Sequence, residues 1–278
     1  MNNPQWLNES FIRLTVFAGV LVLMAVWEFA APRRPQGVRR GGRWPANLGI
    51  AALNAVMLKL VLPVSAMGFA LYVQTQGWGL FNWLHAPAWA AIPLAFVLLD
   101  LAIYAQHVLF HAVPVLWRLH RMHHADLEFD VTTGLRFHPV EMLLSMGIKF
   151  AVIAALGPPL MAVLLFEVML NATAMFNHGN VRLPLALDAV LRRAVVTPDM
   201  HRVHHSIVPA ETNSNFGFNL PWWDRLFGTY RAQPAAGHDA MTIGIAAFRA
   251  PGELRLDRML LQPLRTANVP ESVGASGS

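Results

Sequence analysis

The amino-acid sequence predicts an all-α, polytopic integral membrane protein with about four to five membrane helices. Apolar residues make up 55% of the 278-residue chain, charged residues only 13%, and the mean hydropathy is +0.41. Ordinary soluble domains have fewer apolar and more charged residues. Long apolar runs alternate with short polar segments, and about 20 apolar residues suffice for a helix to cross the ~30 Å hydrocarbon core of a bilayer.

The first predicted span is residues 11–31, which Pro32 ends. The following loop has no acidic residue and contains five arginines: Arg33, Arg34, Arg39, Arg40 and Arg43. Because cytoplasmic loops are enriched in Lys and Arg, we expect this loop to be cytoplasmic and the amino terminus external. The net charge of +5 fits the same bias. No basic run is interleaved with aromatic residues as in single-strand binders, so nucleic-acid binding is not indicated.

Three further apolar runs follow. Residues 46–73 are predicted to carry the chain outward and residues 88–106 to return it. The run at 140–176 is interrupted by the Gly-Pro-Pro sequence at 157–159. Each half of about 17 residues, at a rise of about 1.5 Å per residue, is barely long enough to cross. We therefore predict a helical hairpin whose two ends emerge on the same side.

Ten of the twelve histidines fall in clusters or short motifs. Two are copies of H-x-x-H-H, at residues 120–124 and 201–205, and an H-x-x-x-H lies at 107–111. Positions i, i+3 and i+4 of a helix lie on one face, so each H-x-x-H-H can direct three imidazoles at one point. The candidate metal ligands are His107, His111, His120, His123, His124, His138, His178, His201, His204 and His205. The predicted topology places all ten on the cytoplasmic side.

Imidazole ligands favour iron, copper, nickel or zinc over magnesium and calcium, which prefer oxygen. Eight to ten imidazoles exceed what one ion needs. We therefore predict two metal ions, each with four or five nitrogen ligands and an open position, although the spacing alone does not choose iron over zinc. The chain has no cysteine, which excludes disulfides, thiolate zinc sites and iron–sulfur clusters.

The order of these motifs resembles that of the fatty acid hydroxylase/sterol desaturase superfamily. The resemblance covers residues 100–230, nearly half of the chain. Besides the histidine motifs it includes R-F-H-P-V-E at 136–141, N-H-G-N at 177–180, E-T-N-S-N-F-G at 211–217 and W-D-R-L-F-G-T-Y at 223–230. The sequence departs from the family at Val108, where an arginine is frequent, and at Arg182, where some members have another histidine.

The resemblance implies a non-haem di-iron oxidoreductase that uses O2 and external electrons to hydroxylate or desaturate a lipid, such as a fatty acyl chain or a sterol-like molecule. It implies metal ligation by the clustered histidines. For His138 the alternative is that it binds no metal and that its H-P-x-E segment supports the site. Glu141 of this segment would then orient an imidazole or cap the next helix. Four further polar residues are expected to fix imidazole tautomers: Asp199, Asn213, Asn215 and Asp224. The alternative is that they form turns and helix caps.

The implied partners are a lipid substrate, the bilayer and a separate electron donor (a ferredoxin, cytochrome or reductase), which the arginine-rich inner face would dock. We expect a multi-pass protein of the cell membrane. Its regions are predicted to be N-terminal transmembrane helices and a basic loop (1–86), a fatty acid hydroxylase-like catalytic domain (87–232), and a tail (233–278) with a short helix at 253–264 and a disordered end.

A histidine-rich membrane protein that binds metal or haem without oxygenase activity is the alternative. A membrane cytochrome places isolated histidines opposite each other within its spans, and a metal transporter places histidines and acids along them. Here the histidines lie at span ends. Zinc hydrolases with H-E-x-x-H and ferritin-like proteins with E-x-x-H are disfavoured, because neither motif occurs.

Overall fold

The structure is a computed structural model that describes residues 5–267, and these residues are helical with no strand among them. Five segments are long and apolar enough to cross a membrane: Glu9–Ala30, Arg40–Trp83, Ala88–Ala112, Pro139–Leu156 and Leu160–Asn177. The prediction of an all-α membrane protein with four to five membrane helices is therefore confirmed. The predicted disorder of the chain end lies outside the described residues.

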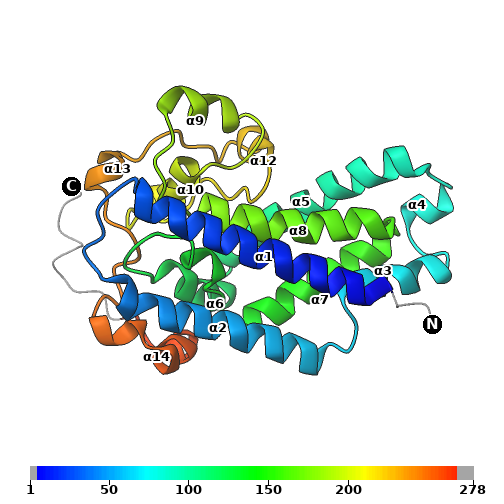
Figure 1. Ribbon diagram of the computed structural model, residues 1–278, viewed down its shortest axis with the longest axis horizontal. Helices are drawn as coiled ribbons and strands as arrows, with labels where there is room; N and C mark the ends of the chain where they lie inside the picture. The colour runs from blue at the N-terminus through cyan, green and yellow to red at the C-terminus, as the bar shows by residue number, and fades with distance from the viewer. Residues whose placement is uncertain (1–4, 268–278) are drawn as a thin grey trace.

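The long helices lie side by side along the longest axis of the molecule (Figure 1). They are α1 (Gln5–Ala30), α2 (Arg40–Val61), α5 (Ala88–Ala112), α7 (Pro139–Leu156) and α8 (Leu160–Asn177). The short helices α3 (Ala66–Thr75) and α4 (Leu80–Trp83) lie at one end. At the other end lie α6 (Pro114–His124), α9 (Leu185–Leu191), α10 (Pro198–His204), α11 (Pro209–Thr212), α12 (Trp222–Leu226), α13 (Gly237–Ala240) and α14 (Leu256–Leu261). We call this end, residues 113–138 and 178–267, the cap.

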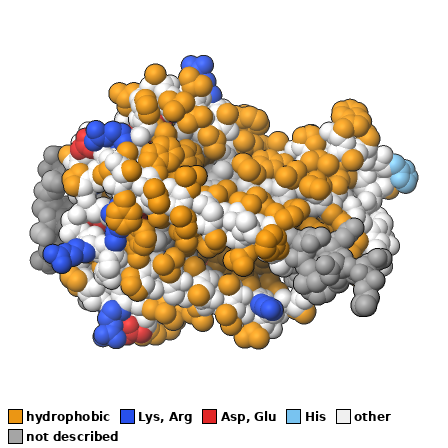
Figure 2. Space-filling view, in the orientation of Figure 1, with side chains coloured by type: hydrophobic (Ala, Val, Ile, Leu, Met, Phe, Trp, Pro, Cys, Tyr) orange, Lys and Arg blue, Asp and Glu red, His pale blue; other side chains and the backbone are white. Residues whose placement is uncertain are grey.

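Charge and apolar surface are divided between the two parts of the molecule. On the face seen in Figure 2, most charged side chains lie toward the cap, and hydrophobic side chains cover the long helices. Phe11, Leu23 and Phe29 of α1 are all exposed. In a bilayer such side chains contact lipid, so their exposure is expected.

The predicted second span, residues 46–73, is two helices rather than one. α2 ends at Val61, and the next residue, Leu62, has extended backbone angles (φ −111°, ψ 101°). Leu62 precedes Pro63, and a proline sterically disfavours the helical conformation of the residue before it. The side chain of Ser65 then caps α3. Run length alone did not reveal this break.

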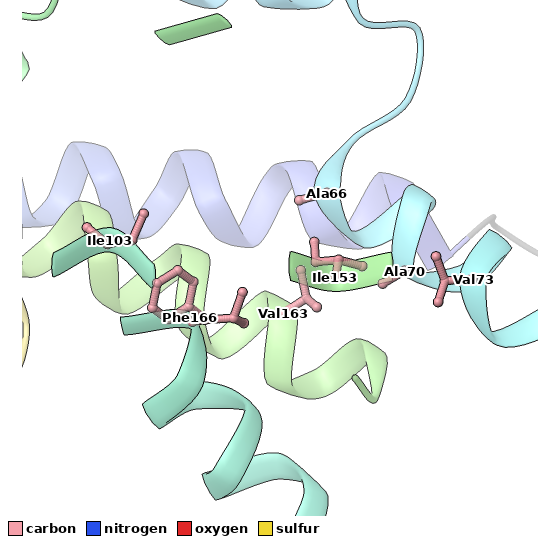
Figure 3. Packing of buried hydrophobic residues seen from close by; sticks show 8 residues of the cluster. Ala66, Ala70, Val73, Ile103, Ile153, Val163 and Phe166 are labelled. Atoms are coloured by element: carbon pink, nitrogen blue, oxygen red, sulfur yellow. The ribbon is translucent and has the colours of Figure 1, made fainter. Parts of the chain in front are cut away.

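After the break, α3 packs against α7 and α8 (Figure 3). Ala66 and Ala70 of α3 lie one turn apart, and both are buried against Ile153 of α7 and Val163 of α8. The small alanine side chains allow the helices to approach closely. This packing forms the main hydrophobic cluster of the membrane region, which also includes Phe166.

The predicted hairpin is confirmed at the Gly-Pro-Pro sequence. α7 ends at Leu156, and Gly157 follows in the left-handed conformation (φ 60°, ψ 51°). A Cβ atom there would lie 2.3 Å from the carbonyl oxygen of Trp78. Only glycine combines this conformation with so close an approach. The hairpin returns the chain to the cap, where His178 follows α8.

The arginine-rich loop after α1 is bound to the cap. Arg43 is fully buried, and its guanidinium donates to Asp126 (2.6 and 2.7 Å) and to Asp130 (2.6 Å). Arg33 pairs with Asp199 and Asp239. These arginines therefore join the membrane helices to the cap, a use that the charge bias did not predict.

The tail also packs on the cap. The predicted helix at 253–264 is instead a 3-10 turn, the short helix α14 and a second 3-10 turn at Gln262–Leu264. Pro263 has no backbone N–H to continue a helix, which accounts for this end. Arg121 of α6 donates to the carbonyl oxygens of Gln262 (2.5 Å) and Arg265 (2.6 Å). The tail thus covers the outer side of the helix that carries the first H-x-x-H-H.

Candidate metal centre

Nine histidines converge where the cap ends of α5 and α8 meet α6 and α10. They form two groups, and within each group the candidate ligand atoms all lie within 4.8 Å of one another. The first group is His107, His111, His120, His124 and His204. The second group is His123, His178, His201 and His205. Both groups are enclosed by protein, and all of their members except the half-buried His111 are buried.

Each H-x-x-H-H motif divides its imidazoles between the groups instead of directing all three at one point. In α6, His120 and His124 belong to the first group and His123 to the second. On α10 the assignment is reversed, with only His204 in the first group. The helical period explains this division, because position i+4 lies about 40° to one side of position i and i+3 about 60° to the other. Each motif thus contributes to two sites.

The imidazole nitrogens within each group lie at distances suited to a shared metal ion. In the first group, Nε2 of His107 is 3.1 Å from Nε2 of His120. In the second, Nε2 of His178 is 3.1 Å from Nε2 of both His123 and His201. Two nitrogens bound about 2.0–2.1 Å from one ion at near-tetrahedral or right angles lie about 2.9–3.4 Å apart. The nitrogen spacing therefore fits metal ligation.

Several ring nitrogens of the two groups lack hydrogen-bond partners. Among the described residues these are Nε2 of His204, both ring nitrogens of His205, and Nδ1 of His123, His124 and His201. An unpartnered buried polar atom is costly, and a metal ion bound at Nε2 of His204 and at one nitrogen of His205 would remove that cost there. Burial, together with the neighbouring imidazoles, holds the pKa of these five side chains well below its ordinary value. The rings are therefore neutral, the form that binds metal.

Several rings are oriented by hydrogen bonds to their second nitrogen. Nδ1 of His120 lies 2.6 Å from Oε1 of Glu141. Main-chain carbonyl oxygens accept from the Nδ1 atoms of three others: Phe216 O from His107, Ser214 O from His204 and Ala174 O from His178, at 2.7–2.8 Å. Such contacts fix the tautomer that leaves Nε2 free for metal.

The expected orienting residues thus have different outcomes. Glu141 orients His120, and Oδ1 of Asn213 lies 3.3 Å from Nδ1 of His111. The other three do not contact a clustered histidine: Asp199 pairs with Arg33 and Arg202, Asn215 bonds main-chain groups, and Asp224 accepts from the Phe216 and Gly217 N–H groups. Asn215 has the left-handed conformation of a turn residue (φ 52°), as the alternative expected, whereas Asp199 and Asp224 cap no helix and instead stabilise the cap through an ion pair and loop hydrogen bonds.

His138 lies outside both groups. Its Nδ1 accepts from the Val140 N–H and caps α7, and its Nε2 lies 3.3 Å from the Leu260 carbonyl oxygen. Both ring nitrogens therefore already have partners from the protein. The H-P-x-E segment supplies a helix cap from His138 and an orienting carboxylate from Glu141.

Sequence reasoning missed the main-chain acceptors and one glycine. A Cβ atom on Gly134 would lie 2.5 Å from the Ala174 carbonyl oxygen and 3.1 Å from Nδ1 of His178. Gly134 therefore leaves room for the carbonyl that orients this ring. Since any residue has a carbonyl group, no residue-type signal in the sequence marks these contacts.

A small cavity of about 40 Å³ adjoins the first group. Its polar lining residues are Gln106, His107, His120 and Glu141, and its apolar ones are Ile103, Phe110, Phe137 and Phe218.

The fold and the site together define a helical membrane protein that buries nine clustered histidines. Its family is established by comparison, because the fatty acid hydroxylase model matches residues 92–229. The chain belongs to the fatty acid hydroxylase superfamily. The match contains every clustered histidine and the segments that orient them.

Curated relatives are lipid-modifying enzymes. Ornithine lipid hydroxylase OlsE from Rhizobium tropici is 27% identical over 267 residues, 93% of this chain and 77% of that protein. Alkylglycerol monooxygenase from Danio rerio is 30% identical over 186 residues, and that from Xenopus tropicalis is 27% identical over 192 residues. The chain spans 40–41% of the length of these two monooxygenases. No solved structure matches the chain.

Proposed function

We propose that the protein is a membrane-bound, O2-dependent lipid hydroxylase with a di-iron centre. The observation that carries the proposal is the pair of buried imidazole groups at the inner ends of apolar helices, in a chain of the fatty acid hydroxylase superfamily. The proposed ligands are His107, His111, His120, His124 and His204 for one ion, and His123, His178, His201 and His205 for the other. In this proposal His138 caps a helix and binds no metal.

Iron supplies the activation of O2 that amino-acid side chains lack, which an unactivated C–H bond requires. The chain itself positions the reactants. Phe110, Phe137 and Phe218 surround the cavity beside His107 and His120, where an acyl methylene would lie against the first group. Glu141 and the main-chain carbonyl oxygen of Phe216 hold the rings of His120 and His107 in one tautomer, which leaves their Nε2 atoms free to hold iron beside this cavity.

Hydroxylation, rather than desaturation, is the proposed reaction. The relatives that cover most of this chain carry the names hydroxylase or monooxygenase, and their named substrates are an ornithine lipid and alkylglycerols. Both lipids join a long hydrocarbon chain to a polar headgroup. We propose a substrate of this class, with a short part of its hydrocarbon chain reaching the small cavity beside His107 and His120.

The test is lipid mass spectrometry of membranes from cells that express the wild type or His204→Ala, grown with iron and air. One lipid class should gain one oxygen atom per molecule in wild-type membranes only. Loss of two hydrogens would instead identify a desaturase. If purified wild-type protein binds no iron and both membranes have the same lipids, the proposal is wrong.

We further propose that the cap is cytoplasmic and receives electrons from a separate donor protein. The support is the arginine-rich loop, which joins α1 to α2 at the cap. A reporter active only in the cytoplasm, fused after Ser278, is expected to be active, because the described part of the tail packs on the cap. The same reporter at the amino terminus should be inactive. The opposite pair of results contradicts this orientation.

Glu141→Gln is expected to weaken iron binding about 10- to 100-fold, the usual effect of losing a residue that orients a ligand. The glutamine keeps the size of the side chain but removes the negative charge 2.6 Å from Nδ1 of His120. Competition with a chelator measures the change in affinity. The matched control is Glu253→Gln, since Glu253 pairs with Arg265 in the tail. Equal iron affinity in the two variants contradicts the orienting role.

A further inference from the structure

Helix α9 of the cap has an inverted distribution of polar and apolar residues. Leu185 is 75% exposed and Val190 61% exposed, and Leu187 is exposed as well. Asp188, the single charged residue of this helix, is 4% exposed and pairs with Arg192. A helix on a water-facing surface has the reverse pattern, with its apolar residues directed inward. α9 thus has the pattern of a helix in contact with lipid.

A second exposed apolar surface adjoins α9. In and just after α12, Trp222, Leu226 and Phe227 are all exposed. The indole N–H of Trp222 donates to the carbonyl oxygen of Arg193 (2.8 Å), which connects α12 to the segment following α9. We call Leu185, Leu187, Val190, Trp222, Leu226 and Phe227 the apolar ridge. Hydrophobic side chains also cover the surface over α9 in Figure 2.

The contacts of α12 with α5 show how deep the ridge lies. The indole N–H of Trp223 donates to Asp100 (2.8 Å), and the ring of Phe227 stacks on Tyr104 with 5.5 Å between centroids. Asp100 is in the middle of α5, about 18 Å along the helix from Ala88 at about 1.5 Å per residue. Tyr104 is about 24 Å from Ala88 on the same basis.

The outer end of α5 is marked by Trp89, which is 80% exposed, as tryptophans at a membrane surface are. A hydrocarbon layer about 30 Å thick that begins there covers about 20 residues of α5, as far as residue 108. Both contacts of α12, at Asp100 and Tyr104, fall short of that limit. The α12 part of the ridge therefore lies at the depth of the leaflet on the cap side.

We propose that the apolar ridge inserts into the cap-side leaflet of the bilayer and anchors the cap there, in addition to the membrane-spanning helices. Its occupant is lipid: acyl chains contact the six apolar side chains. Arg193 and Arg225, both exposed next to the ridge, would bind the phosphate groups of anionic headgroups. This inference depends on burial and depth alone, and it holds whether or not the protein hydroxylates a lipid.

The absence of cysteine from the chain makes a direct test simple. Single cysteines replace Leu187 or Leu226 and carry a nitroxide label, in full-length protein reconstituted into vesicles of phosphatidylcholine and phosphatidylglycerol. Electron paramagnetic resonance then compares collisions of the label with O2, which concentrates in lipid, and with a nickel chelate, which stays in water. Val22→Cys, on the exposed face of α1, is the lipid control, and Arg255→Cys, exposed on the cap, is the water control.

The labels at Leu187 and Leu226 are expected to collide several-fold more with O2 than with the nickel chelate, as the label at Val22 does. Collision ratios like that of Arg255 mean that water covers the ridge, which overturns the proposal. Low collision rates with both reagents mean that protein covers the ridge, which also overturns it. In that case, spin–spin broadening would identify a second copy of the chain. Elution of each variant at the wild-type position in gel filtration checks that it is folded.

Discussion

His204→Ala and His123→Ala are each expected to lower product formation more than about 100-fold, since even residues that only orient ligands change metal affinity or activity 10- to 100-fold. His204 belongs to the five-histidine group and His123 to the four-histidine group. Each variant should therefore lose iron from a different position of the proposed centre. Iron per chain, measured on purified protein, should fall together with activity.

The two variants also distinguish a dinuclear centre from two independent sites. Nε2 of His178 lies 3.1 Å from Nε2 of both His123 and His201. Removal of His123 leaves three imidazoles in that group. If only one group supports the reaction, one of the two variants keeps its activity. Full turnover by both variants contradicts the proposed centre.

His85→Asn is the matched control. His85 lies outside both histidine groups, is exposed, and has a positive φ of 47°. Asparagine adopts this conformation more readily than most residues, so the substitution should not strain the backbone. Iron content and product formation should equal those of the wild type. Iron loss in this variant would mean that the measurement responds to any histidine replacement.

Arg43→Ala is expected to destabilise the folded protein by about 3–5 kcal/mol, the usual cost of removing one partner from a buried ion pair. Its guanidinium donates to two fully buried carboxylates, Asp126 and Asp130. Without it these charges remain buried with fewer partners. The midpoint of chemical unfolding in detergent, followed by circular dichroism, measures the loss.

Arg39→Ala is the control, because Arg39 directly precedes α2, whose first turn contains Arg43, but is exposed. The expected change there is less than about 0.5 kcal/mol, as for most surface substitutions. Equal midpoints for Arg43→Ala and the wild type would mean that the buried ion cluster does not stabilise the junction between the spans and the cap. Because Asp126 is two residues from His124, iron content should be measured in the same samples.

The sequence by itself determined the properties that depend on local composition. Apolar run length was enough to locate the membrane segments, although not the break between α2 and α3, since every such segment must satisfy its backbone hydrogen bonds within a helix. The interruption at 157–159 could also be predicted from local residue types. The two prolines cannot continue α7, and Gly157 adopts a conformation that favours glycine. The histidine motifs likewise stood out, because repeated H-x-x-H-H motifs have few other uses, although the tenth candidate, His138, caps a helix instead.

Tertiary structure decided which groups meet. The helical period separates the imidazoles of each H-x-x-H-H, but the two sites form only because α6 and α10 face each other across the centre, which neither motif encodes alone. The carbonyl groups that orient His107, His178 and His204 come from segments whose residue types carry no signal. Arg43 is typical of a cytoplasmic loop in sequence, yet it is fully buried because Asp126 and Asp130 fold over it. The sequence therefore showed that the histidines and Arg43 are present, and long-range packing determined which residues they contact.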